Sequence, residues 1–181
     1  MKKLLIGALV GGFIIFGWQT ASWTFLKLHN SEMMQAKDQD GIINYLSTHF
    51  SEDGQYMIPR ANDNASSKEM EDFQKNTTGK PWAMVTYHKA YDANMVMNMI
   101  RGILTAMIAA FFACWISMKQ NPRSAMTTFL SCLFIGIAGY LYIPYAGHIW
   151  MQNPGALQNL LDVIVSWGVC GIWLGWWLNR K

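Results

Sequence analysis

Four apolar runs, each about twenty residues long, constrain the fold of this chain more than any other feature. They cover residues 4–25, 95–118, 125–145 and 160–178 of the 181-residue sequence. A helical run of this length matches the hydrocarbon thickness of a bilayer. Because backbone groups inside a bilayer must be paired within the protein, each run is expected to be a helix. The sequence therefore predicts an all-α integral membrane protein with four transmembrane helices.

The charged residues are sorted along the chain in a way that predicts its orientation. Ten of the eleven acidic residues lie between positions 27 and 92. The basic residues that flank the apolar runs have no acidic neighbour in their segments, and they are Lys2, Lys3, Lys119, Arg123, Arg180 and Lys181. Short basic loops stay in the cytoplasm, so both termini are expected inside. The short start and compact loops favour a bacterial inner membrane.

These two patterns divide the chain into eight segments. The transmembrane helices are expected at 1–25, 94–118, 125–145 and 160–178. An exported cap at 26–93 separates the first two helices. A cytoplasmic loop at 119–124, a short periplasmic loop at 146–159 and a cytoplasmic tail at 179–181 complete the chain. The first run is interpreted as a retained helix, because it is longer than the apolar core of a cleaved signal.

The exported cap is predicted to be small and mostly helical, with a short extended piece at 55–58. Apart from Gly102, no residue between Pro81 and Lys119 breaks a helical pattern. The second transmembrane helix is therefore expected to begin near Pro81 and to protrude from the membrane. At 1.5 Å per residue its length would be about 57 Å. The first helix is likewise expected to continue outward to Met34.

A polar stripe follows the outer part of this long helix. Its members recur at steps of four and three residues, which places them on one helix face: Tyr87, Tyr91, Asn94, Asn98, Arg101 and Thr105. An arginine is costly when it faces lipid, so Arg101 needs a partner. Asp162 is the only acidic residue within an apolar run and lies at a similar depth. We therefore predict an intramembrane charge pair between Arg101 and Asp162, either as a structural clamp or as part of a pathway or ligand site.

Two histidines at the outer membrane face leave a ligand site open. The candidate residues are Tyr87, His88, Tyr91, Asn94, Asn98, Tyr145 and His148. Imidazoles at a membrane face can ligate haem or exchange protons near a quinone head group. Their spacing matches no haem-attachment motif, so interfacial hydrogen bonding is favoured and no cofactor or metal is expected. His29 and His49 are interpreted as loop residues, and the thirteen methionines as flexible packing.

Small residues mark the helix faces that are expected to pack closely. Gly7 and Gly11 share one face of the first helix, and Gly168, Gly171 and Gly175 recur in the fourth. Small side chains at such spacing allow two helix backbones to approach. The three cysteines all fall within apolar runs and are expected to be buried without a disulfide.

The functional hypothesis is a non-enzymatic accessory or scaffold subunit of a larger membrane complex. Its expected partners are the lipid bilayer and other membrane protein subunits. The alternative is a small carrier, or a redox module that binds quinone, haem or another ligand at the periplasmic face. An enzyme that acts on lipid is disfavoured because no nucleophile and base form a recognisable pair. Nucleic acid is excluded because the bases form no stripe.

Overall fold

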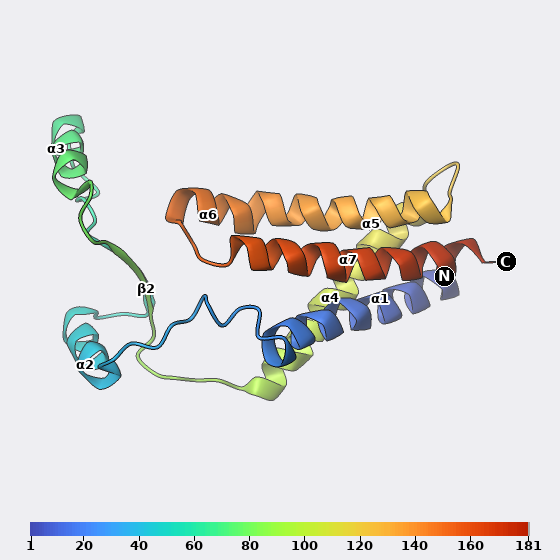
Figure 1. Cartoon of the computed structure of the whole chain (residues 1–181), viewed down its shortest axis with the longest axis horizontal. Helices are drawn as coiled ribbons and strands as arrows, with labels where there is room; N and C mark the ends of the chain where they lie inside the picture. Colours follow the sequence, from blue (N-terminus) through green and yellow to red (C-terminus); the bar gives the residue numbers. More distant parts are fainter. Residues whose placement is uncertain (181) are drawn as a thin grey trace. The chain divides into compact units, whose positions relative to one another are not determined.

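The computed structural model of the chain describes residues 1–180 and contains four helices long and apolar enough to cross a membrane (Figure 1). Residues 1–34 and the chain from Asn94 onward form one compact unit, and residues 35–93 form a second. The elements of the first unit are α1 (Lys2–Thr20), the π-helical turn η1 (Ala21–Phe25), α4 (Met95–Met118), α5 (Ala125–Tyr140), the π-helical turn η2 (Leu141–Tyr145), α6 (Ala146–Met151) and α7 (Ala156–Asn179). The prediction of four helices able to span a membrane is confirmed.

The third spanning helix is longer than predicted. It was expected to end at Tyr145, yet it continues through η2 into α6 and ends at Met151. Pro144 lies inside η2. Proline has no N–H and crowds the preceding turn, and a π-helical turn relieves both problems by widening the hydrogen-bond spacing. Pro144 therefore modifies the helix without ending it.

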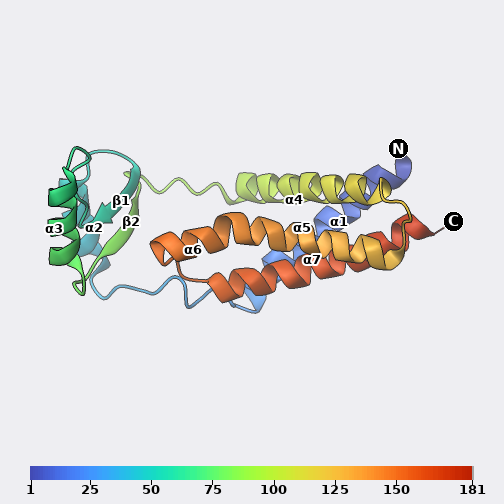
Figure 2. The same ribbon diagram turned by 90° about the horizontal axis from the view of Figure 1, so that it is seen from above.

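The spanning helices pack along their small residues. Helix α1 lies against α4 and α7, and α7 also lies against α5 (Figure 2). The core between them contains the fully buried Cys114, Cys132 and Cys170, which are free thiols. Leu174 and Leu178 complete the buried surface of α7.

The glycines of α1 and α7 differ in how closely they meet a neighbour. A Cβ on Gly11 would lie 3.1 Å from Cβ of Ala110, and one on Gly7 would lie 2.8 Å from Sγ of Cys114. On α7, Gly171 and Gly175 approach backbone carbonyls of α5, whereas Gly168 has open space around it. Close packing thus involves four of the five glycines named above.

The start of α1 and the end of α7 lie side by side at one end of the helix bundle (Figures 1 and 2). The Lys3 ammonium donates a hydrogen bond to the Arg180 carbonyl at 2.6 Å, and the Trp177 indole donates to the Lys3 carbonyl at 2.7 Å. Arg123 donates to the Leu178 carbonyl at 3.1 Å. Basic residues from three separate segments therefore gather at the same end of the bundle.

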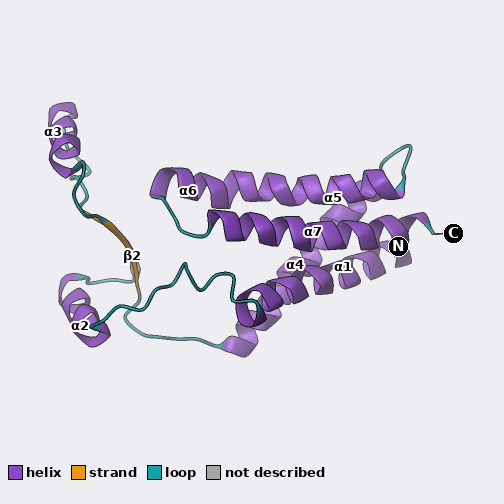
Figure 3. Cartoon of the chain, viewed as in Figure 1, coloured by secondary structure: helices purple, strands orange, loops and turns teal. Residues whose placement is uncertain are grey.

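The second unit contains two helices, coloured purple in Figure 3, and an antiparallel strand pair, whose two strands are labelled in Figure 2. Its elements are α2 (Gln39–His49), β1 (Gly54–Ile58), α3 (Ser67–Thr77) and β2 (Ala83–Tyr87). Phe50 stacks on Tyr56 at 3.8 Å between ring centroids and meets Tyr87 edge-on at 5.5 Å. Among the described residues of the second unit, Tyr87 is the one buried apolar residue. This small aromatic cluster supports the strand pair.

Two expectations for the cap were wrong. The second spanning helix does not begin near Pro81: β2 and a loop occupy that region, and α4 begins after Asn94, whose side chain accepts a hydrogen bond from the Met97 amide at 3.0 Å. Residues 83–87 are strand because they pair with β1, a tertiary contact that overrides local preference. The first helix does not reach Met34 either, since it ends in η1 and Lys27 adopts a left-handed φ of 53°.

Candidate functional site

The candidate site begins where the chain leaves the first spanning helix. After η1, the backbone turns back at Lys27, and the Leu28 amide donates to the Ser22 carbonyl at 3.0 Å. This turn carries His29 inward, where only 2% of the residue is exposed. His29 lies beside Asp162, on the second turn of α7. A residue just outside one membrane span is thereby joined to an acid inside another.

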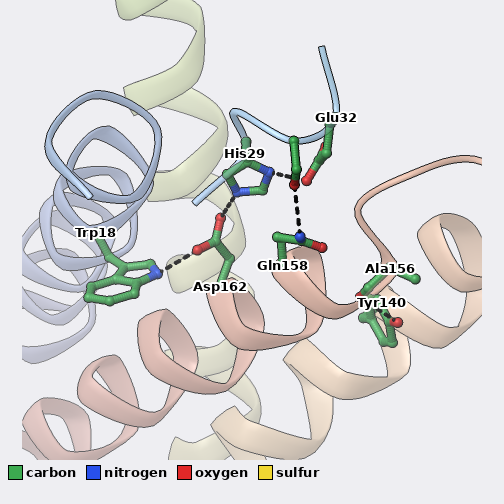
Figure 4. Close-up of polar contacts among 8 residues, drawn as sticks. Trp18, His29, Glu32, Tyr140, Ala156, Gln158 and Asp162 are labelled. Carbon is green, nitrogen blue, oxygen red and sulfur yellow. Dashed lines mark hydrogen bonds and ion pairs between the residues drawn. The ribbon is translucent and has the colours of Figure 1, made fainter. Parts of the chain in front are cut away.

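Asp162 and His29 are the centre of a hydrogen-bonded cluster (Figure 4). Nε2 of His29 lies 2.9 Å from Oδ2 of Asp162, and Nδ1 lies 2.6 Å from Oε1 of Glu32. The Trp18 indole N–H donates to Oδ1 of Asp162 at 2.9 Å. The Trp23 ring stacks on the imidazole at 4.1 Å between centroids, with an interplanar angle of 2°. The imidazole is thus held by a carboxylate at each nitrogen and by an indole on one face.

Further contacts attach the segment after η1 to the start of α7. The Gln158 amide donates to the Ser31 hydroxyl at 3.3 Å (Figure 4). Gly155, the N-cap of α7, has a φ of 85°, and a Cβ there would lie 2.2 Å from Cδ of Glu32. Only glycine combines that backbone conformation with this close approach of the Glu32 carboxylate. We call residues 26–34 the return segment.

The predicted charge pair between Arg101 and Asp162 is not formed. Both carboxylate oxygens of Asp162 already accept hydrogen bonds, from Trp18 and His29. Arg101 is exposed on α4, and it takes part in none of the ion pairs found among residues 1–180. Similar depth along two helices predicted the pair, but the Asp162 carboxylate contacts Trp18 and His29, whereas Arg101 lies on an exposed face of α4.

The predicted polar stripe is likewise divided between elements. Asn98, Arg101 and Thr105 do share an exposed face of α4, with Asn94 as its N-cap. Tyr87 is instead in β2, where it is buried, and Tyr91 is in the following loop with 97% of its surface exposed. The stripe therefore runs along α4 alone, because the helix begins at Met95.

The two histidines proposed for a ligand site belong to different units and have separate partners. Nδ1 of His148 lies 2.7 Å from the Asn153 carbonyl, to which it donates, and the Tyr145 ring is 6.1 Å away. His88 lies in the second unit, with Nδ1 3.3 Å from Oδ2 of Asp53. Within the part of the chain that is described, no group of three or more metal-ligating side chains could hold an ion.

In the second unit, the Asp53 carboxylate contacts two residues that follow β2. The Lys89 amide donates to its Oδ1 at 3.0 Å, and His88 contacts the other oxygen. The hydrogen bond from the Lys89 backbone, and then that from His88, lower the pKa of Asp53 below its usual value. These contacts fix the chain just beyond β2, next to a cavity lined in part by Ile43, Thr86 and Tyr91.

Comparisons with protein-family models, with curated proteins and with solved structures found no match to this chain.

His29, Trp18 and Glu32 were not predicted from the sequence as members of the cluster. His29 was interpreted as a loop residue because no metal or haem motif surrounds it. Two signals pointed the other way: His29 and Glu32 are three residues apart directly after a membrane span, and Asp162, near one end of another span, needs a partner. A buried acid requires hydrogen-bond donors, and an imidazole at the same membrane face is one of the few groups that can supply them.

Proposed function

We propose that this chain is a non-enzymatic accessory subunit of a larger membrane complex and that it binds its partner through the exposed face of α4. The observation that carries the proposal is Arg101, a charged side chain exposed on a helix able to span the membrane. Its guanidinium has no ion pair among residues 1–180. The partner is therefore expected to supply the missing carboxylate.

The depth of Arg101 makes such a partner favourable. Arg101 is the seventh residue of α4, about 9 Å along the helix axis from Met95 at 1.5 Å per residue. An arginine at the centre of a membrane helix costs roughly 2.5–3.5 kcal/mol by insertion scales, and less near the interface. Asn98 is exposed on the same face one turn away. Thr105 is satisfied within the helix, because its hydroxyl donates to the Arg101 carbonyl at 3.0 Å.

The carboxylate for Arg101 must come from another molecule. Asp162 is the only acid in the four apolar runs, and its two oxygens are occupied by Trp18 and His29. We commit to a transmembrane helix of a second protein that carries Asp or Glu in its outer third. Polar side chains of this kind hold membrane helices together through interhelical hydrogen bonds.

The same proposal places the chain in a bacterial inner membrane with both termini in the cytoplasm. Lys3, Arg123 and Arg180 make their contacts at one end of the bundle, next to the α4–α5 loop that carries Lys119. A concentration of basic residues in short segments is typical of the cytoplasmic side. The outer end of α4, with Arg101, would then face the periplasm together with residues 35–93.

The test is purification of the tagged chain from native membranes, with native mass spectrometry of the product. We expect a defined complex with a membrane protein that has an intramembrane carboxylate. Replacing Arg101 with Leu should reduce recovery of that partner at least tenfold, which corresponds to about 1.4 kcal/mol. Phe134→Leu, at an exposed position on α5 and so outside the proposed binding face, is the control and should leave recovery unchanged.

Charge reversal distinguishes a specific pair from incidental capture. Arg101→Asp should abolish the complex, and exchanging the partner's carboxylate for Arg should restore it. A monomer that retains only anionic lipid would mean that Arg101 binds lipid phosphate, and this would contradict the proposal. A monomer with a haem absorption band would favour the redox alternative.

A further inference from the structure

We infer that His29, Glu32 and Asp162 form a buried proton-binding site, in which the imidazole carries two protons and fastens the return segment to α7. The site uses residues other than those of the proposed partner-binding face. It also does not depend on whether a partner exists. The ligand of this site is the proton. The inference is based on the number of hydrogen bonds that the three side chains make.

The hydrogen-bond count requires two protons. Nδ1 of His29 lies 2.6 Å from a Glu32 oxygen, and Nε2 lies 2.9 Å from an Asp162 oxygen. An ionised carboxylate can only accept hydrogen bonds. Each of these two contacts therefore needs its own hydrogen. A neutral imidazole has one N–H and would direct a lone pair at the second carboxylate, so the three side chains must share at least two protons.

The surroundings favour both protons on the imidazole. The carboxylate of Asp162 is stabilised as an anion by the Trp18 N–H at 2.9 Å. Glu32 lies beside Gly155, the N-cap of α7, where unpaired amides and the helix dipole favour negative charge. The Trp23 ring lies parallel to the imidazole at 4.1 Å, and an indole face attracts a cation. The result is an imidazolium between two carboxylates, with a net charge of −1.

No other charge contacts the ring among the described residues. Trp23 of η1 stacks on the ring, and Trp18 of α1 donates to Asp162; neither indole titrates. Lys27, on the return segment, is exposed. The hydroxyl of Tyr140, at the end of α5, donates a hydrogen bond to the Ala156 carbonyl at the start of α7, at 2.8 Å. The protons therefore belong to the three groups as a coupled set.

Removing one proton should loosen the return segment. A nitrogen lone pair would then face a carboxylate at hydrogen-bond distance, and the net charge of the buried cluster would change from −1 to −2. One of the two contacts must break, and both join the return segment to itself or to α7. The attachment is therefore complete while the imidazole is doubly protonated and weakens as the pH rises far enough to remove the second proton.

The test is nitrogen NMR of the full chain in nanodiscs with ¹⁵N-labelled histidine. The chain has four histidines, and His29→Asn identifies the signals of position 29. We expect both ring nitrogens of His29 to carry a proton at pH 7. In Glu32→Gln, the amide can donate to Nδ1, so a neutral ring satisfies both contacts and the second proton should leave at a lower pH. Glu52→Gln, at an exposed carboxylate, is the matched control and should change nothing.

Attachment of the return segment is measured by trypsin cleavage after Lys27 relative to cleavage at the exposed Arg60. His29→Phe retains a ring against Trp23 but removes both donors, and it should raise this ratio about tenfold because two buried contacts are lost. A single protonated nitrogen in the parent chain at pH 7 would overturn the inference, as would an unchanged Glu32→Gln titration or an unchanged cleavage ratio. If a variant fails to fold, the NMR measurement on the unmodified chain still tests the inference.

Discussion

At the scale of single residues, Asp162 illustrates what a carboxylate requires inside a membrane helix. The residue is 9% exposed, and each of its oxygens accepts a hydrogen bond. A buried carboxylate without partners would cost several kcal/mol. Its two donors come from α1 and from the return segment, so one side chain connects three parts of the chain.

Replacing Trp18 with Phe should destabilise the first unit by roughly 1–3 kcal/mol, because one oxygen of a buried carboxylate loses its donor. The effect is measured by thermal unfolding in detergent. Trp150→Phe is the control, since Trp150 is 80% exposed and its indole makes no hydrogen bond among residues 1–180. Equal effects of the two substitutions would show that the Trp18 hydrogen bond contributes nothing to stability.

The residue scale also explains why the partner of Asp162 was predicted wrongly. The sequence shows that a lone acid in a span needs a partner, and it shows which residues lie at the same depth. It does not show the rotation of one helix about its axis relative to another. Arg101 has the right depth but points away, whereas His29 reaches Asp162 because the chain turns back at Lys27.

At the scale of helices, the contact between α1 and α4 depends on Gly12. A Cβ at this position would lie 2.5 Å from Cγ and 2.6 Å from Cα of Met107. The second atom is backbone, so a side-chain rotation does not relieve the clash. The two helices therefore approach as closely as they do only because residue 12 has no side chain.

Gly12→Ala should cost about 1–3 kcal/mol, the usual range for overpacking a close interface. Gly17→Ala is a matched control on the same helix, because nothing lies within 4 Å of a Cβ there. The two variants have the same change in helix propensity, so the difference between their unfolding temperatures isolates the clash. A Gly12→Ala protein as stable as Gly17→Ala would mean that α1 and α4 are not packed this closely.

The second unit shows where element prediction from sequence fails. An extended piece near residues 55–58 was anticipated, but its partner strand at 83–87 was assigned to a helix. Strand pairing is a long-range contact, and Ile58 lies opposite Ala83 across 25 positions of the sequence. Local patterns carry little information on such pairing, whereas the caps of α3 and α4 are local and follow from Ser66 and Asn94.

For the whole molecule, the proposed orientation in the membrane is argued from charge and can be tested with fusion proteins. A fluorescent protein fused after the C-terminus should fluoresce in a bacterial host, because the fluorescent protein folds when it stays in the cytoplasm. Alkaline phosphatase at the same place should be inactive, and phosphatase inserted at Asn64, in an exposed loop of the second unit, should be active. The reverse pattern would contradict both the proposed orientation and a periplasmic position for residues 35–93.

The number of helices able to span a membrane and their approximate bounds follow from the sequence, because the length of each apolar run is a local property that can be compared directly with the bilayer thickness. The sequence also identified Asp162 and Arg101 as charges that need an explanation. The contacts of Asp162 with His29 and Trp18, the exposure of Arg101 on α4 and the strand at residues 83–87 became known from the three-dimensional structure. Each of these depends on how distant segments rotate and turn toward one another, which no local pattern encodes.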